Sequence, residues 1–364
     1  MQIQVFNADY AKQLVHRVKT ILLWDISLTI VVILLLIEAI IYPRRASRWI
    51  TSIDWTSITV IAGLVIGSSL LESSGALHSM MFSLQSRIGP KYIYPVIIMS
   101  SGLLASIVLN DAAVFVSVPA ALSVSSRDKH DQAKVLVLVL AAINIGSALT
   151  PFGNPQDVII THYYNLHLSG YLAFTIPIYL PILLLIALYS MRIRPLQVNP
   201  ASLKVSKPIA VLGSVLIVTA IISSLTRRPI ILVPLIVLSI IMARDSISAK
   251  DLSIIPLLIG IFAIITTIDY TPHIYNNYSI TYIEGYTLSL IISNVPATIA
   301  LLGAPWKPLH LAVNLAGTMH PYSSLANLIG LRLAGQKWST YMRKNVIPAM
   351  LLLCYGFIVV CLLL

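Results

Sequence analysis

The stretch Asn144-Ile-Gly-Ser-Ala-Leu-Thr-Pro-Phe-Gly-Asn-Pro-Gln-Asp-Val-Ile-Ile160 has a second copy, Asn314-Leu-Ala-Gly-Thr-Met-His-Pro-Tyr-Ser-Ser-Leu-Ala-Asn-Leu-Ile-Gly330, which begins 170 positions later. The copies align without a gap, so that Asn144 corresponds to Asn314 and Pro151 to Pro321. Each copy interrupts an apolar run with a proline and small polar residues. Within a bilayer, such an interruption frees backbone N–H and C=O groups, which only protein or a polar cavity can satisfy. Paired interruptions in the two halves of a chain are typical of the binding site of a secondary transporter.

The composition excludes an ordinary soluble protein. Apolar residues make up 57% of the 364 residues and charged residues 10%, which is too little charge to cover a soluble surface. Uncharged runs such as 209–225 and 230–243 predict an all-α, polytopic membrane protein. The net charge of +11 does not indicate nucleic acid as a partner, because the cations lie in short loops beside apolar runs. There they set the topology and meet the head groups of the lipid bilayer.

The apolar runs predict the membrane spans. Residues 1–19 are too polar to span, and two of the predicted spans are expected to be helices broken near 151–156 and 319–324. The predicted spans cover about residues 20–42, 56–72, 134–168, 171–191, 208–225, 229–243, 252–268, 306–333 and 345–364.

Two further regions are apolar on both sides of a polar centre. Residues 92–125 surround Asn110-Asp111-Ala-Ala, and residues 283–303 surround Ser293-Asn294-Val-Pro-Ala-Thr298. The second region is too short for two spans with a turn, and in both regions the polar residues lie in the middle. We therefore predict two re-entrant hairpins whose tips end near the middle of the bilayer, with their backbone buried in protein.

The basic residues predict the orientation. The first hairpin is flanked by Arg87, Lys91, Arg127, Lys129 and Lys134, which indicates that it enters from the cytoplasm. The flank of the second hairpin, residues 270–284, has no Lys or Arg and is expected outside. Hairpins entering from opposite faces predict inverted repeats, about 1–195 and 199–364, within one membrane domain 1–364. We expect a multi-pass protein of the plasma membrane with a cytoplasmic N-terminus.

Two carboxylates are candidate site residues. A carboxylate at the centre of a bilayer costs about 2.5–3.5 kcal/mol, so Asp111 is expected to face a cavity or a partner. Its alternative role is a structural hydrogen bond that ties the hairpin tip to a broken helix. Asp157 follows the first break, where it either binds a cation or caps the exposed N–H groups of the second half-helix. The corresponding residue of the second copy is the neutral Asn327.

Amides and hydroxyls also gather at the breaks and hairpin tips. The N-termini of half-helices attract an anion, and Asn, Ser and Thr oxygens with unwound carbonyls provide ligands for Na⁺ or a path for protons. The candidates are Asn110, Thr150, Asn154, Gln156, Ser293, Asn294, Thr298, Thr318, Ser323, Ser324 and Asn327, and the candidate Na⁺ ligands among them are Asn110, Asn154, Asn294 and Asn327. His320 in the second break is expected to make a local hydrogen bond, and the remaining histidines, His310 among them, are expected at the membrane interfaces without ligand spacing.

Four motifs in chain order resemble those of the ion transporter superfamily, most closely its citrate-transporter-like and arsenite/anion permease branch. They are Asn110-Asp111-Ala-Ala, Leu149-Thr-Pro-Phe-Gly-Asn-Pro-Gln156, Ser293-Asn-Val-Pro-Ala-Thr298 and Ser324-Leu-Ala-Asn-Leu-Ile329. The resemblance implies a homodimer in which a transport domain, carrying both hairpins and both broken helices, moves against a scaffold in an elevator-type mechanism. It also implies that the site is lined by Asn110, Asp111, Gly153, Asn154, Pro155, Ser293, Asn294, Ser324 and Asn327. This sequence departs from the usual pattern at Asp157, where Asn is usual, and at Ser323, where Gly is usual.

A transporter is the leading interpretation of the function. The chain has no H-E-x-x-H, G-x-S-x-G or Walker A motif, so we expect no enzyme and no cofactor beyond a coupling ion. We expect a secondary active permease for a small anion, coupled to H⁺ or Na⁺. The alternative is a Na⁺/H⁺ antiporter on the same fold, which applies if Asp111 and Asp157 form one site for a monovalent cation. A channel is disfavoured, because a channel has no need of two inverted hairpins.

Overall fold

The computed structural model describes residues 26–363 except 47–48, 54, 127, 197–204, 227 and most of 248–276. The predicted polar segment 1–19 and most of the predicted span 252–268 therefore lie outside the described residues. The chain forms two compact units, Met1–Ile58 with Ser253–Asp269, and Thr59–Leu252 with Tyr270–Leu364. The smaller unit contains α2 (Ile26–Ile41), α3 (Pro43–Ala46) and α4 (Trp49–Ser52).

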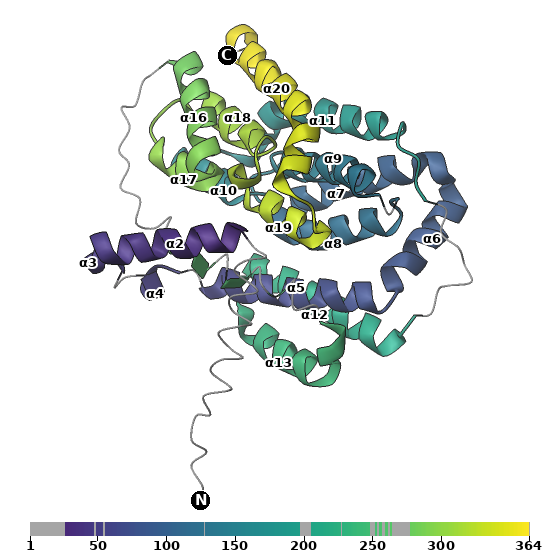
Figure 1. Cartoon of the computed structure of the whole chain (residues 1–364). Helices are drawn as coiled ribbons and strands as arrows, with labels where there is room; N and C mark the ends of the chain where they lie inside the picture. Colours follow the sequence, from purple (N-terminus) through teal and green to yellow (C-terminus); the bar gives the residue numbers. More distant parts are fainter. Residues whose placement is uncertain are drawn as a thin grey trace, which may run out of the picture. The chain divides into compact units, whose positions relative to one another are not determined.

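The larger unit carries both duplicated stretches and consists of helices (Figure 1). In its first part these are α5 (Trp55–Ser73, which starts in the smaller unit), α6 (Ala76–Ile88), η1 (Pro90–Tyr92), α7 (Ile93–Ile107), α8 (Asn110–Ser123), α9 (Lys129–Ser147), α10 (Pro155–Tyr163) and α11 (Leu168–Ser190). They are followed by α12 (Lys207–Thr226), η3 (Pro229–Ile231), α13 (Leu232–Ala243), η4 (Arg244–Ser246), α16 (Tyr278–Ile292), α17 (Asn294–Ala300), α18 (Trp306–Ala316), η5 (Pro321–Ser323), α19 (Leu325–Ala334) and α20 (Trp338–Leu363).

The surfaces of several helices are apolar, as in a protein surrounded by lipid. Three helices of the described chain are long and apolar enough to cross a membrane: Leu168–Ser190, Pro229–Ser246 and Trp338–Leu362. Large apolar side chains point outward from these helices, for example Ile241 and Leu362, which are 74% and 76% exposed. Water would penalise such a surface, whereas hydrocarbon does not. The protein is therefore an all-α, polytopic membrane protein.

Both duplicated stretches are broken helices. In the first, α9 ends at Ser147 and α10 begins at Pro155; in the second, α18 ends at Ala316 and α19 begins at Leu325. Proline is well suited to begin α10, because the N–H that it lacks would have no partner in the first helical turn. We call residues 148–154 the first break and residues 317–324 the second break.

The two predicted hairpins are pairs of helices that meet at a short tip. Helices α7 and α8 meet at Val108 and Leu109, of which Val108 has extended backbone, and α16 and α17 meet at Ser293. The two helices of each pair pack against each other. In both pairs, the polar residues predicted from the sequence begin the second helix, Asn110 in α8 and Asn294 in α17.

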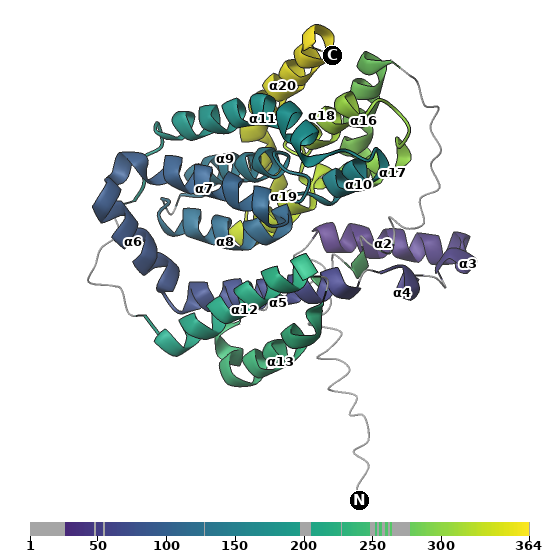
Figure 2. The ribbon, with the colours of Figure 1, turned by 180° about the vertical axis from the view of Figure 1, so that it is seen from behind.

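The packing of these elements follows the same pattern in both halves. The first helix of each hairpin packs on the first half of the broken helix that follows it, α7 on α9 and α16 on α18. The second helix of each hairpin packs crosswise on the other half, α8 on α19 and α17 on α10 (Figures 1 and 2). The halves are thereby interlocked, which brings both hairpin tips toward both breaks.

Small residues allow these helices to approach closely, as is common between membrane helices. Gly146 of α9 lies so near the backbone of Gly102 in α7 that a Cβ atom at Gly146 would overlap it. In the other half, a Cβ atom on Gly285 of α16 would lie 3.0 Å from the Cβ of Ala312 in α18. The close packing of α7 on α9 and of α16 on α18 holds each hairpin beside the broken helix of its own half.

Candidate functional site

The hairpin tips are shaped by their asparagines. The Oδ1 of Asn110 accepts the N–H of Asp111 at 2.9 Å, and the Oδ1 of Asn294 accepts the N–H of Val295 at 2.9 Å. Each side chain thus satisfies one of the N–H groups that the start of a helix leaves free. The remaining N–H groups at the starts of α8 and α17 give both tips a partial positive charge.

Each tip is hydrogen-bonded to the break in its own half. The N–H of Asn110 donates to the carbonyl of Gly153 at 2.8 Å, and the Oγ of Ser293 donates to the carbonyl of Ser323 at 3.4 Å. Gly153 and Ser323 occupy equivalent positions of the duplicated stretch. A Cβ atom at Gly153 would overlap the carbonyl of Ser147, so only glycine fits the first break here.

Asparagines at equivalent positions also connect the two halves. The Nδ2 of Asn144 donates to Asn327 Oδ1 at 2.9 Å, and the Nδ2 of Asn314 donates to Asp157 Oδ1 at 2.8 Å. Asn144 corresponds to Asn314 in the sequence copies, and Asp157 corresponds to Asn327. All four side chains are at most 2% exposed. These reciprocal contacts place the two breaks side by side in one buried polar network.

Asn144 and Asn314 each make one further hydrogen bond of the same kind. Each donates to the carbonyl four residues earlier in its own helix, Asn144 to Leu140 and Asn314 to His310, both at 2.9 Å. Sequence reasoning identified the alignment of Asn144 with Asn314 but did not include either residue in the site. Both residues stand first in their copy of the duplicated stretch, and this equivalent position was the signal that could have placed them in the site.

Asn314 and Asn327 have different hydrogen-bond partners at the two breaks. Asn314 Oδ1 accepts the side-chain amides of Asn154 and Gln156 at 3.0 and 3.1 Å. In the second break, Asn327 Nδ2 instead donates to the backbone carbonyls of Gly317 and His320 at 2.6 and 3.0 Å. Asn314 therefore bonds side chains of the first break and α10, whereas Asn327 bonds backbone carbonyls of the second break. The carbonyls of Thr318 and Met319 in the second break also accept from Asn345 Nδ2, at 2.5 and 2.7 Å.

Asp157 also contacts a histidine that sequence reasoning left without a role. The Nε2 of His310 lies 3.2 Å from Asp157 Oδ1, and both side chains are fully buried. The hydroxyls of Tyr171 and Tyr179 lie 2.7 and 3.1 Å from the two ring nitrogens of His310. His310 is thus in the interior, contrary to the expectation of a histidine at an interface. The equivalent residue of the first copy is Leu140, so of the two copies only the second places a histidine here.

The remaining predicted residues occupy the same region with different partners. Thr150 Oγ1 donates to the carbonyl of Ser106, Thr298 Oγ1 to that of Asn294 at 2.8 Å, and Thr318 Oγ1 to that of Leu315 at 2.7 Å. Ser323 Oγ donates to the carbonyl of His320 at 2.7 Å and accepts its N–H at 3.1 Å. The predicted local hydrogen bond of His320 is present, because its Nδ1 accepts the N–H of Tyr322 at 3.2 Å.

Several buried oxygens of the breaks and tips have no hydrogen-bond partner among the described residues. They are Asp111 Oδ1, Asn154 Oδ1, Gln156 Oε1 and Ser324 Oγ. Of the four candidate Na⁺ ligands, Asn154 is the one whose side-chain oxygen is free, whereas Asn110, Asn294 and Asn327 already accept a hydrogen bond. Buried acceptors without donors are costly unless a donor or a cation joins them.

A cavity of about 630 Å³ opens to the surface beside the first break. Pro151 and Phe152 line it from the break, His162 from the end of α10, and His167 from the turn between α10 and α11. Phe152 is 57% exposed.

Ser293 has a backbone conformation that favours glycine, with φ 75° and ψ 159°. Such a conformation costs about 1–3 kcal/mol for other residues. We expect Ser293→Gly to raise the free energy of unfolding by about 1 kcal/mol, because this relief exceeds the extra chain entropy of glycine. Transport should nevertheless fall, since the hydroxyl contact with the second break is lost. Thermal unfolding and uptake measurements test this, with Ser293→Ala as the control that loses the hydroxyl but keeps the strain.

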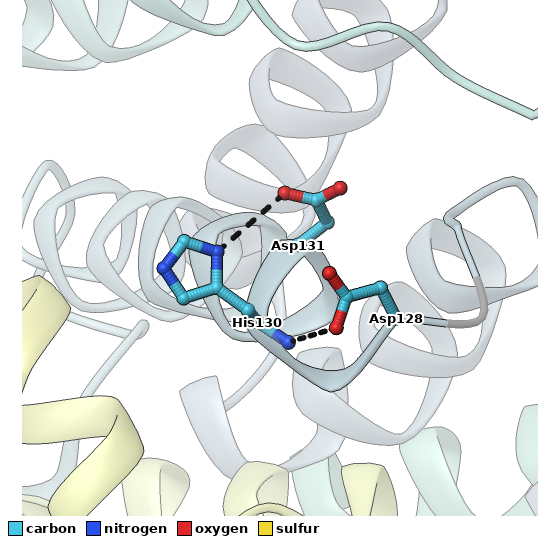
Figure 3. A group of neighbouring side chains, drawn as sticks. All are labelled: Asp128, His130 and Asp131. Carbon is cyan, nitrogen blue, oxygen red and sulfur yellow. Dashed lines mark hydrogen bonds and ion pairs between the residues drawn. The ribbon is translucent and has the colours of Figure 1, made fainter.

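A second group of titratable side chains lies at the start of α9 (Figure 3). Asp128 accepts the N–H of His130 at 3.0 Å, and Asp131 accepts a hydrogen bond from Lys134 Nζ at 2.8 Å. The hydrogen bond from Lys134 lowers the pKa of the Asp131 carboxyl. The first contact caps the helix and the second is an exposed ion pair, so helix capping and solvation explain this group.

Comparison with known sequences places these features in a wider context. The sequence model of the citrate transporter family matches residues 15–321. The inner membrane protein YbiR of Escherichia coli is 27% identical over 321 residues, which cover 81% of this chain and 84% of the relative. An uncharacterized transporter of Methanocaldococcus jannaschii is 28% identical over 316 residues, which cover 83% of this chain and 86% of the relative. An uncharacterized transporter of Mycobacterium tuberculosis is 26% identical over 140 residues, 38% of this chain and 32% of that protein.

Proposed function

Because the chain belongs to the citrate transporter family and is a membrane transporter of that family, we propose that it is a secondary active permease for a small anion. We propose further that transport is coupled to H⁺ or Na⁺ and uses an elevator-type movement. The observation that carries the proposal is the buried network in which Asn144 bonds Asn327 and Asn314 bonds Asp157. A transporter needs one site at the interface of two repeats, and these bonds join the two breaks directly.

The same bonds support the inverted repeats. When two copies of one unit are related by a two-fold axis, residue i of one contacts residue j of the other, and j contacts i. The pairs Asn144–Asn327 and Asn314–Asp157 have this reciprocal form, as does the crosswise packing of α8 on α19 and α17 on α10. A two-fold axis in the membrane plane gives hairpins that enter from opposite sides.

The chemistry of the network favours an anion as substrate and a cation as coupling ion. Helices α8, α10, α17 and α19 all begin at a tip or a break, so their positive ends converge on one region. The free oxygens of Asp111 and Asn154 suit a cation instead. A region that offers both kinds of partner can bind an anion and a cation together.

The Na⁺/H⁺ antiporter alternative depends on Asp111 and Asp157 sharing an ion. The Asp157 carboxylate contacts the side chains of His310, Asn314 and Asn154, at 3.2, 2.8 and 3.3 Å. A carboxylate with these three partners has less capacity left for a transported ion, which supports the anion permease over the antiporter.

The proposed assembly is a homodimer in the plasma membrane with a cytoplasmic N-terminus. The exposed apolar faces of α12 and α13 suit contact with lipid or with a second copy of the chain.

Counterflow in proteoliposomes tests the function. Purified protein is reconstituted, and uptake is measured for a panel of anions that includes citrate, other di- and tricarboxylates and arsenite, with and without Na⁺ and a pH gradient. We expect saturable uptake of at least one anion that a gradient of Na⁺ or H⁺ accelerates. Exchange of Na⁺ for H⁺ without any anion flux would instead identify the antiporter.

The orientation of the hairpins is a separate prediction. In a variant without Cys354 and Cys361, which are both exposed, a single cysteine is placed at the exposed Lys129 or Tyr278. An impermeant thiol reagent should label position 129 from the cytoplasm only and position 278 from outside only, because the cations flank the first hairpin. Labelling of both positions from one side would contradict the inverted repeats.

A further inference from the structure

The amides of Asn154 and Gln156 have a fixed orientation in the first break. Their nitrogens both donate to Asn314 Oδ1, at 3.0 and 3.1 Å. Asn154 Nδ2 also lies 2.6 Å from Ser147 Oγ and 3.3 Å from Asp157 Oδ2. Their oxygens have no partner among the described residues, although each side chain is only 1% exposed. Both amides therefore use their donors inside the protein and leave their acceptors free.

The orientation of Asn314 explains this arrangement. Its Nδ2 donates to Asp157 Oδ1 at 2.8 Å and to the carbonyl of His310 at 2.9 Å. A carboxylate and a backbone carbonyl only accept hydrogen bonds. Asn314 must therefore turn its nitrogen toward them and its oxygen toward Asn154 and Gln156. The carboxylate of Asp157 and the carbonyl of His310 together set this direction, and Asp157 Oδ2 also accepts from Asn154 Nδ2 at 3.3 Å.

We infer that Asp157 and Asn314 are positioning residues, which set the direction of this chain so that the oxygens of Asn154 and Gln156 remain free to bind Na⁺. The inference rests on the proposed function, because Na⁺ would be the coupling ion of the same transporter. Neutral amide oxygens are suitable ligands for a hard cation, and a bound cation removes the cost of leaving buried acceptors unpaired.

The second half lacks the residues for an equivalent arrangement. Ser324 and Ala326 stand where the first half has Asn154 and Gln156, and Asn327 stands where it has Asp157. An amide at position 327 can donate as well as accept, and its nitrogen bonds Gly317 and His320. This arrangement therefore orients amides at the first break only, which predicts one Na⁺ of this kind for each protein chain.

Thermal unfolding of the purified full-length protein tests the inference without measuring transport. The protein is titrated with NaCl, and choline chloride keeps the ionic strength constant. A ligand that binds the folded state raises the melting temperature, so Na⁺ should stabilise the wild type. Asp157→Asn should raise the Na⁺ concentration for half-maximal stabilisation about 10-fold or more, the usual range for residues that orient metal ligands. Asp131→Asn, at an exposed carboxylate, should leave it unchanged.

An unchanged Na⁺ response in folded Asp157→Asn would overturn the inference. Two further outcomes are decisive. If Asp157→Asn does not fold, Gln156→Leu replaces it, because this variant removes a free oxygen without touching Asp157. An unchanged Na⁺ response in Gln156→Leu would overturn the inference. A wild type that Na⁺ does not stabilise would overturn it as well. The proposed anion transport would still be tested separately by anion counterflow, which can be measured without Na⁺.

Discussion

His310→Leu is expected to lower the free energy of unfolding by about 1–3 kcal/mol, the typical cost of leaving a buried hydrogen-bonding group without its partner. His310 and Asp157 are fully buried, with 3.2 Å between Nε2 and Oδ1. Leucine would leave the carboxylate without this partner and the hydroxyl of Tyr179 without its contact to Nδ1. Thermal unfolding of purified protein should therefore show a melting temperature several degrees below that of the wild type.

The sequence itself provides the compensating change. The residues equivalent to Asp157 and His310 in the other half are Asn327 and Leu140, a neutral pair that the fold already accommodates. Asp157→Asn combined with His310→Leu should therefore recover much of the lost stability, because an amide replaces the carboxylate that loses its histidine partner. His130→Leu, at a histidine whose side chain is 53% exposed, should change stability by no more than about 0.5 kcal/mol. Equal melting temperatures for His310→Leu and the wild type would show that the pair contributes nothing to the fold.

Asp111→Asn is expected to weaken binding of the coupling ion about 10- to 100-fold while the protein still folds. Asp111 begins α8 at the first hairpin tip, and its Oδ1 is buried without a hydrogen-bond partner among the described residues. An interaction with a charged group contributes about 1.5–3 kcal/mol, which corresponds to this range of affinity. Asparagine has nearly the same shape, so the packing of the tip should persist. Coupled uptake in proteoliposomes measures the effect.

The control for Asp111 is the exposed Asp131, whose replacement by asparagine should leave uptake unchanged. A structural role of Asp111 would give the opposite result, with a lower melting temperature and normal uptake per folded molecule. That outcome would remove Asp111 from the site and leave the amides of the first break as the coupling-ion ligands.

Much of the fold could be predicted from local sequence. Proline and small polar residues within apolar runs end a helix for steric and hydrogen-bonding reasons that do not depend on the rest of the chain. The breaks before Pro155 and around Pro321 and the tips at Asn110 and Asn294 were therefore predictable. The duplication of one stretch also predicted which positions of the two halves are equivalent.

The partners of those positions depended on the tertiary structure. In the sequence, Asn144 and Asn314 are ordinary polar residues of apolar helices, and such residues are often only packing contacts. Their contacts to Asn327 and Asp157 arise because each broken helix lies against the other half, 183 and 157 residues away in the chain.

The partners of His310 also could not be predicted from local sequence. It lies one helical turn before Asn314 and so on the same face of α18, but its burial depends on Tyr171 and Tyr179 from α11 and on Asp157 from α10. The sequence by itself determined where the helices break and which residue types stand at the breaks, because these follow from the chemistry of neighbouring residues. Only the packing of distant helices decided which donors meet which acceptors, because a hydrogen bond depends on distances of a few ångströms that local sequence does not specify.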